Sequence, residues 1–185
     1  GVLYETAHRV GVTWRENTTA GVAGDVPAHF YSYSFALNPD WSHHYSSGAE
    51  IQAYFEDIAR RYEVDARIRY NCEVTRCQFV DGRWRLELSD GSSDEGDVII
   101  AATGVLHQPS IPDFPGRDKF QGPAFHSARW DDSVAMEGKR VGIIGTGSSA
   151  IQMTSALVDK VESLTLFQRT AQWITPAEDA PYEDC

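Results

Sequence analysis

The chain has 185 residues, of which 42% are hydrophobic and 23% are charged, and its formal net charge is −11. This length allows one well-buried core or two small domains, and the frequent apolar residues argue against intrinsic disorder. The acidic charge disfavours a nucleic acid as partner, and no apolar run approaches the roughly 18 residues that a membrane helix needs. Three cysteines without a Cys/His ligand pattern disfavour a disulfide framework and a metal site, so we expect a reducing, cytoplasmic setting.

The first quarter of the chain is irregular and aromatic. The sequence opens on Gly1, without a methionine, directly in the strand-like segment 2–5, so we expect an internal piece of a longer protein. Residues 1–47 then interleave aromatic side chains with Gly, Pro, Asn and Asp. Such a stretch wraps a ligand or covers the edge of a core, and composition does not separate the two.

A helix and a set of strands are predicted next. Ser47 and Glu50 have the spacing of a capping box, and apolar residues then recur at helical intervals at 51, 54, 55, 58 and 62. Asp81-Gly82 predicts a tight hairpin turn between strands at 77–80 and 84–88. The continuous apolar run at 97–101 predicts a strand covered on both faces in a parallel sheet.

A proline-rich connection divides the sequence. Prolines at 109, 112, 115 and 123 exclude a helix and a central strand there, so we expect a domain boundary near 110–138. A strand–turn–helix–strand unit follows at 139–144, 145–147, 148–160 and 163–167. We expect its helix to pack through Ile151, Ser155 and Val158.

The turn of this unit carries the strongest chemical signal, a G-x-G-x-x-A motif from Gly145 to Ala150 between a buried strand and a helix. In such a motif the first glycine, Gly145, permits a tight turn, and the second, Gly147, lets the backbone approach a pyrophosphate. Ala150 is small enough for close packing of helix on strand, and free amides at the helix start bind the anion. The alternative is a glycine turn that serves packing alone.

A residue at the end of the second strand selects the dinucleotide. An acid there would bind the ribose 2′-hydroxyl of NAD, whereas this chain has Arg169, whose planar guanidinium suits a 2′-phosphate. NADP is therefore favoured, unless Arg169 is only a solvated cation. Residues 2–5 resemble the second strand of another dinucleotide unit, in which Glu5 would accept hydrogen bonds from a ribose, although an acid ending a strand is ordinary.

Three stretches resemble one family. Residues 11–14, 21–25 and 29–35 resemble the flavin-contacting segment of class B flavoprotein monooxygenases, and 102–116 resembles the link between their two cofactor domains. Residues 120–131 match the F-x-G-x-x-x-H-x-x-x-W-[PD] fingerprint of type I Baeyer–Villiger monooxygenases. The related N- and S-oxidising flavin monooxygenases share its beginning but usually lack the tryptophan found here at Trp130.

The resemblance implies an α/β fold with two dinucleotide-binding, Rossmann-like units, both incomplete, in which the NADP domain is inserted in the FAD domain. It implies a partial FAD-binding domain at 1–110, a linker with the fingerprint at 111–138 and a partial NADP-binding domain at 139–185. The implied reaction is the NADPH- and FAD-dependent insertion of one oxygen atom of O₂ into a ketone, which gives an ester or lactone. The oligomeric state stays open.

The resemblance also implies roles for single residues. Asp25 is the implied catalytic residue, near the flavin and nicotinamide rings and paired with an arginine. The residues implied for FAD are Glu5 at the ribose, Thr13, Trp14 and Arg15 along the nucleotide, Tyr31 at the flavin ring and Val74 at the adenine end. The residues implied for NADP are Gly145, Thr146, Gly147, Ser148, Ser149, Ala150, Ile151, Arg169 and Thr170. The residues implied to order the linker are Phe120, Gly122, His126 and Trp130.

The chain also departs from the family pattern. Val12 replaces a usual glycine, and the first glycine-rich loop, the arginine partner of Asp25 and the substrate pocket are missing. We therefore expect the 185 residues alone to be inactive. An N- or S-oxidising monooxygenase and a non-catalytic nucleotide-binding fragment are the alternatives.

Overall fold

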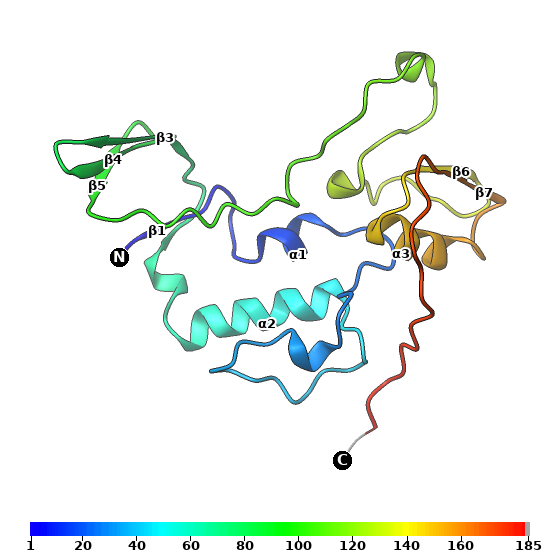
Figure 1. The fold of residues 1–185 in the computed structure, drawn as a ribbon, viewed down its shortest axis with the longest axis horizontal. Helices are drawn as coiled ribbons and strands as arrows, with labels where there is room; N and C mark the ends of the chain where they lie inside the picture. The colour runs from blue at the N-terminus through cyan, green and yellow to red at the C-terminus, as the bar shows by residue number, and fades with distance from the viewer. Residues whose placement is uncertain (184–185) are drawn as a thin grey trace. The chain divides into compact units, whose positions relative to one another are not determined.

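The computed structural model describes residues 1–183 and divides into two compact units. The first unit comprises Gly1–Val12 and Ala53–Val105, and the second comprises Thr13–Gln52 with the described residues from Leu106 onward. Each unit is therefore assembled from two separate stretches of the chain (Figure 1).

The first unit contains two small sheets. Strand β1 (Leu3–Tyr4) pairs in parallel with β2 (Ile68–Arg69), which follows a 3₁₀ turn at Asp65–Arg67. Strands β3 (Val74–Val80), β4 (Arg83–Leu88) and β5 (Ser93–Gly96) form an antiparallel sheet in the order of the chain. The predicted hairpin turn is confirmed, because Asp81 and Gly82 have φ values of 53° and 81° between β3 and β4.

The strand predicted at 97–101 is wrong. The third strand of the sheet is β5, which ends at Gly96, and residues 97–101 form no strand. Val98 and Ile100 are 76% and 86% exposed. A strand of this apolar composition needs neighbours on both edges and both faces, and no described strand pairs with it.

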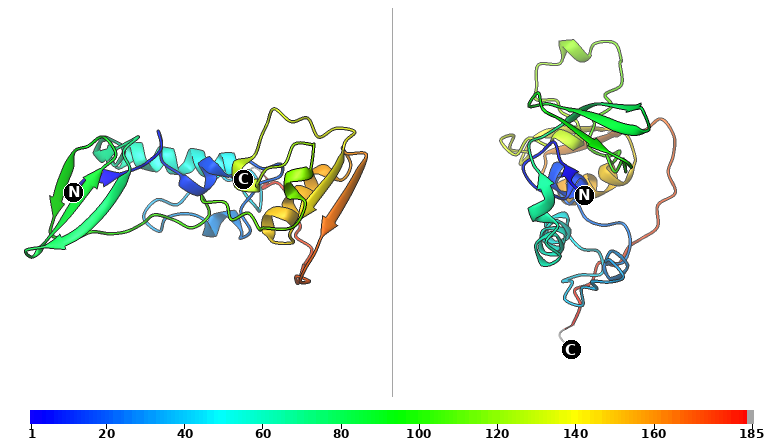
Figure 2. Two further views of the ribbon diagram at one scale, coloured as in Figure 1. Left: turned by 90° about the horizontal axis from the view of Figure 1, so that it is seen from above. Right: turned by 90° about the vertical axis from the view of Figure 1, so that its left-hand side faces the viewer.

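The second unit contains the predicted strand–turn–helix–strand. Strand β6 (Arg140–Ile144) pairs in parallel with β7 (Ser163–Phe167) from Arg140↔Ser163 to Ile144↔Phe167, and helix α3 (Ser148–Leu157) connects them. Figure 2 shows β6 and β7 side by side with α3 next to them.

The buried face of α3 differs from the prediction. Ala150 and Leu157 are buried, whereas Ser155 and Val158 are exposed and Ile151 is only partly covered. Ala150 and Leu157 are seven residues apart, which is close to two helical turns, so they share one face. The buried side of α3 combines a small residue, Ala150, with a large one, Leu157. The prediction did not include Ala150 among the packing residues of the helix.

The irregular early segment contains a short helix that the sequence analysis did not anticipate, α1 (Val12–Glu16). Gly11 precedes it with φ of 101°, a conformation that favours glycine. A 3₁₀ turn follows at Ala28–Phe30. Backbone hydrogen bonds then tie the loop to the start of the next helix: Gly24 N–H donates to Ser46 O at 2.9 Å and Gly48 N–H donates to Val22 O at 3.0 Å.

Helix α2 (Gly48–Arg61) starts at the predicted point. The amide of Glu50 donates to Ser47 Oγ at 3.2 Å, which confirms one half of the capping box. The Glu50 carboxylate does not complete the other half: it accepts hydrogen bonds from Ser42 N and Ser42 Oγ at 2.8 and 2.9 Å. Of the predicted apolar positions, Ile51, Tyr54 and Ile58 are buried and Phe55 is partly buried, whereas Tyr62 lies beyond the end of α2 and is 46% exposed.

The proline-rich connection is irregular, as predicted, apart from 3₁₀ turns at Arg117–Lys119 and Ser127–Arg129. The last described residues lie against the early segment, since His44 N–H donates to Ala180 O and Tyr182 N–H donates to Ser42 O, both at 3.0 Å. Among residues 1–183, no helix is long and apolar enough to cross a membrane.

Candidate dinucleotide site

The glycine turn between β6 and α3 is shaped by two glycines with different backbone conformations. Gly145 has φ of 112°, which side chains disfavour, and its N–H donates to Phe167 O at 3.0 Å at the end of β7. Gly147 stands at the N-cap position of α3 with φ of −74° and ψ of 178°, and no side chain caps the helix there. The turn therefore leads straight from the strand end into an uncapped helix start.

This helix start is open. A Cβ built on Gly147 would find no atom within 4 Å, and Ser148 and Ser149 are exposed. Within residues 1–183, the amides of Ser148 and Ser149 have no hydrogen-bond acceptor, whereas the Ala150 and Ile151 amides donate to Gly147 O. Two unbonded amides at the positive end of a helix are an arrangement that can bind an anion.

The exit of β7 lies next to this turn. Thr146 Oγ1 donates to Thr170 O at 3.2 Å, which joins the turn to the residues that follow β7. Arg169, one position earlier, is exposed and has no hydrogen bond or ion pair with any residue of the described chain. Its guanidinium is available to an anion.

Ala150 lies at the first turn of α3 and is 6% exposed. A larger side chain would have to displace what it packs against, which is the reason that the motif requires a small residue here. Ile151 follows on the partly covered side of the helix.

The predicted flavin residues of the second unit include one contacting pair. Trp14 Nε1 donates to the hydroxyl of Tyr31 at 3.1 Å, and the two rings meet edge to face with centroids 5.6 Å apart. Thr13 lies one residue earlier in α1, and its carbonyl oxygen accepts from Asn17 N and Nδ2 at 3.0 and 2.8 Å. The pair therefore joins α1, which bears Trp14, to the residue that follows the 3₁₀ turn at Ala28–Phe30.

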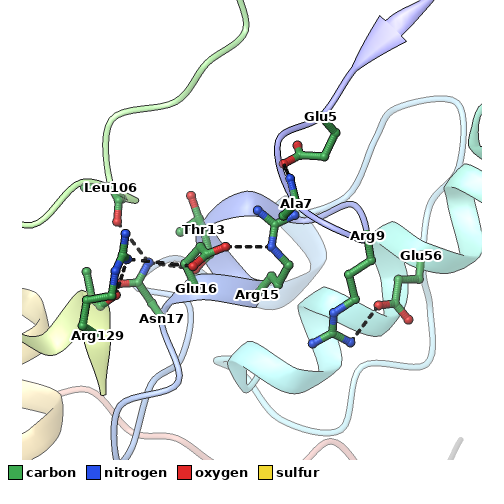
Figure 3. A network of polar contacts seen from close by, with 11 residues as sticks. Glu5, Ala7, Arg9, Thr13, Arg15, Glu16, Asn17, Glu56, Leu106 and Arg129 are labelled. Atoms are coloured by element: carbon green, nitrogen blue, oxygen red, sulfur yellow. Dashed lines mark hydrogen bonds and ion pairs between the residues drawn. The ribbon is translucent and has the colours of Figure 1, made fainter. Parts of the chain in front are cut away.

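The side chain of Arg15 forms an ion pair with the neighbouring residue, Glu16. Its side chain is 7% exposed, and Nε lies 2.9 Å from Glu16 Oε1. The other Glu16 oxygen lies 3.8 Å from an Arg129 guanidinium nitrogen, and Asn17 Nδ2 donates to Leu106 O at 3.2 Å (Figure 3). Glu16 therefore joins α1 to the fingerprint segment, a contact that no spacing in the sequence signals.

Asp25 lies in the loop between Gly24 and the 3₁₀ turn at Ala28–Phe30. Its carboxylate is exposed and forms no hydrogen bond or ion pair with any described residue. The position is accessible to a ligand or to a cationic side chain.

Glu5 and Val74 belong to the first unit, whereas the other predicted site residues belong to the second. Glu5 follows β1, and its Oε1 accepts from Ala7 N at 2.9 Å (Figure 3). Nearby, burial and then a 2.5 Å hydrogen bond to Asp65 raise the pKa of Tyr70 to about 12, with a smaller contribution from the charge of Glu5. Val74 is the first residue of β3 and is half-buried.

The fingerprint residues form local structure. His126 Nδ1 accepts from Ala128 N at 3.0 Å and so caps the turn at Ser127–Arg129. Trp130 packs edge to face on Phe125 with ring centroids 5.4 Å apart. A Cβ on Gly122 would lie 2.8 Å from Cζ of the Phe120 ring, so this position excludes a side chain unless the ring moves.

The turn from Gly145 to Gly147 and the first residues of α3 are called the glycine corner below. A parallel β–turn–α–β unit with such an open glycine corner defines a dinucleotide-binding protein of the Rossmann type. A family model described as pyridine nucleotide-disulphide oxidoreductase matches residues 12–183. The chain belongs to that family.

Named relatives are more specific. A Baeyer–Villiger monooxygenase of Streptomyces coelicolor is 45% identical over 180 residues, covering 96% of this chain and 34% of that protein. The structure of cyclohexanone monooxygenase from Rhodococcus sp. Phi1 bound to NADP⁺ matches with a TM-score of 0.88 and 33% identity, covering 98% of this chain and 35% of that chain. A structure of OTEMO in complex with FAD and NADP matches with a TM-score of 0.88 and 32% identity, covering 97% and 36% of the two chains.

These matches confirm the resemblance and the predicted fold class, a Rossmann-type flavoprotein fold. The chain spans about a third of the length of the relatives that it matches. The domain boundaries and the roles of the single residues stay predictions.

Proposed function

We propose that the chain is part of an FAD- and NADPH-dependent Baeyer–Villiger monooxygenase. The overall reaction consumes a ketone, O₂, NADPH and a proton, and it releases an ester or lactone, water and NADP⁺. The observation that carries the proposal is the open glycine turn at Gly145–Gly147, where the amides of Ser148 and Ser149 have no acceptor in the described chain and a hydrogen bond joins Thr146 to Thr170, next to exposed Arg169. The names of the matched relatives supply the reaction class.

The corner fits NADP. The diphosphate would accept hydrogen bonds from the amides of Ser148 and Ser149, and the absent side chain of Gly147 leaves room for its close approach. Arg169 would hold the 2′-phosphate that distinguishes NADP from NAD, since a guanidinium forms paired charge-assisted hydrogen bonds with phosphate oxygens. Thr146 and Thr170 would keep the two segments in register through their 3.2 Å hydrogen bond.

The residues for FAD fit less completely. Glu5 has its carboxylate just after β1, where the resemblance implies a ribose contact, and Trp14 is hydrogen-bonded to Tyr31, which the resemblance implies at the flavin ring. The guanidinium of Arg15 is buried against Glu16, so Arg15 would act on FAD by holding α1 rather than by contacting a phosphate. When bound, the two cofactors supply hydride transfer and the activation of O₂.

The chain's own contribution to the chemistry is orientation and charge. The exposed carboxylate of Asp25 would orient a cationic or amide group beside the reacting rings. His126 caps a turn through Nδ1 and so would order the linker rather than transfer protons. We place the enzyme in the cytoplasm, and the free thiols of Cys72 and Cys77 agree with a reducing compartment.

Product analysis of the full-length enzyme tests the proposal. With NADPH, ¹⁸O₂ and a cyclic ketone, we expect a lactone that carries one ¹⁸O atom, measured by mass spectrometry. A parallel reaction with a thioether separates the alternatives. Sulfoxide without any lactone would identify an N- or S-oxidising monooxygenase, and no flavin-dependent oxygenation of either substrate would favour a non-catalytic nucleotide-binding protein.

A further inference from the structure

One side chain of α3, that of Gln152, contacts the loop that precedes Asp25. Gln152 Nε2 donates to the carbonyl oxygen of Ala23 at 2.9 Å, and the contact is partly buried. Gln152 lies one turn after the helix start, and Ala23 lies two residues before Asp25. The helix that would face the diphosphate is thus bonded to the loop that bears the implied catalytic carboxylate.

A second contact lies one helical turn further along α3. Gly21 has φ of 73°, and a Cβ built on it would lie 2.8 Å from both Ala156 Cβ and Gln152 O. Real side chains do not tolerate such distances, so only glycine allows this approach of the loop to the helix. Gln152 and Ala156 are four residues apart and share one face of α3, along which the loop runs.

The other side of the same loop is also fixed. Gly24 N–H and Gly48 N–H form backbone hydrogen bonds across to Ser46 and Val22, and a Cβ on Gly24 would lie 3.5 Å from Ile51 Cδ1. The loop is therefore held between α3 and the start of α2. A movement of α3 would therefore be transmitted through the hydrogen bond from Gln152 to Ala23 to the backbone next to Asp25.

We propose that Gln152 is a positioning residue that sets the distance between the NADP-binding corner and the carboxylate of Asp25. The inference rests on the proposed function. The Gln152 amide donates to Ala23 O without carrying a charge, and a side chain of the same length without a donor would leave that partly buried carbonyl unsatisfied. A small misplacement of a carboxylate beside the reacting rings is costly, because hydride transfer requires close alignment.

The test uses the full-length holoenzyme with two substitutions, of which the first has the side-chain length of glutamine and the second is one atom longer. Gln152→Met keeps the length and removes the donor, and Gln152→Lys keeps a donor. We expect Gln152→Met to slow anaerobic flavin reduction by NADPH about tenfold or more, measured by stopped-flow absorbance, because alignment is lost. The dissociation constant of NADP⁺, measured by calorimetry, should change less than about threefold, because the diphosphate and 2′-phosphate contacts remain. Gln152→Lys should recover a large part of the reduction rate.

A readout without turnover accompanies these rates. Hydrogen exchange at the amides of 22–25, measured without added NADP⁺, should be faster in Gln152→Met than in the wild type. Ser155→Ala changes an exposed position on the same helix whose side chain forms no hydrogen bond with a described residue; it is the control and should change none of the three measurements. Gly21→Ala should reproduce the effects of Gln152→Met by pushing the loop off the helix.

The outcomes separate the two proposals. Unchanged flavin reduction and unchanged exchange in Gln152→Met would overturn the positioning role. An equal loss of NADP⁺ affinity and rate would also overturn it, because Gln152 would then act as a binding residue. If the wild type bound no NADP⁺, the proposed function would fail, while the exchange measurement would still decide whether Gln152 holds the loop.

Discussion

Gly145 and Gly147 stand two residues apart and require glycine for different reasons. Gly145 needs it for its backbone, since φ is 112°, whereas Gly147 has an ordinary φ of −74° and open space where a Cβ would lie. Gly147→Ala should therefore leave the free energy of unfolding unchanged and weaken NADP⁺ binding about tenfold or more, because the methyl group would occupy the ligand's approach.

Gly145→Ala is the contrasting substitution. Alanine at this φ should lower the free energy of unfolding by about 1–3 kcal/mol. Denaturant unfolding and NADP⁺ calorimetry on both variants measure the two effects separately. A Gly147→Ala protein that binds NADP⁺ as tightly as the wild type would contradict the assignment of the corner.

Arg169 is predicted to decide between the two nicotinamide cofactors. Removing its guanidinium should weaken NADPH binding about 10- to 100-fold, the range for a charge-assisted hydrogen bond, while NADH binding stays nearly constant. The measurement is the ratio of kcat/KM for NADPH and NADH in Arg169→Ala. Arg140→Ala removes an exposed arginine at the opposite end of β6 and serves as the control. An unchanged ratio would make Arg169 a solvated cation only.

At the scale of single elements, only one half of the capping box predicted at the start of α2 forms. Ser47 caps the helix through Oγ, but the carboxylate of Glu50 binds Ser42, five residues further back than the capping box requires. Ser47→Ala should cost about 1 kcal/mol of unfolding free energy, as the loss of an N-cap does. Thermal and denaturant unfolding of the full-length protein measure this cost.

Glu50→Gln separates the two contacts of the helix start. It keeps the Glu50 amide on Ser47 and weakens only the bonds from Ser42 to the carboxylate. We expect it to leave the helix intact and to loosen the loop before it. A larger loss of stability in Glu50→Gln than in Ser47→Ala would show that the longer contact dominates.

The elements whose signals are local were predicted well. The turn at Asp81-Gly82, the start of α2 and the strand–turn–helix unit around Gly145 each depend on residues a few positions apart. The strand predicted at 97–101 was wrong. A continuous apolar run indicates a strand only where other strands pair with it, and among the described residues no strand pairs with 97–101. Helix α1 was missed because five residues are too few for a periodic pattern.

At the scale of the whole chain, distant segments hold one another. The ring of Tyr182 meets those of His29 and His44 with centroids 4.6 and 4.8 Å apart, beside two backbone hydrogen bonds between the late and early segments. Tyr182→Ala should release the late segment and speed its proteolysis between 171 and 178 several-fold, read by mass spectrometry of the cleavage products. Trp173→Ala removes a fully exposed aromatic side chain and should leave the cleavage rate unchanged.

The sequence by itself determined the dinucleotide corner, because a strand, a glycine turn and a helix form a motif whose chemistry lies within about ten consecutive residues. The sequence also predicted that Arg169 favours NADP over NAD. This prediction needs only the position of Arg169 at the end of the second strand of the same unit. Only the tertiary structure decided that Glu16 lies against Arg129 and that Gln152 donates to Ala23 in the loop before Asp25. Such contacts join residues more than a hundred positions apart, and side-chain partners at that separation are fixed by packing, which leaves no periodic trace in the chain.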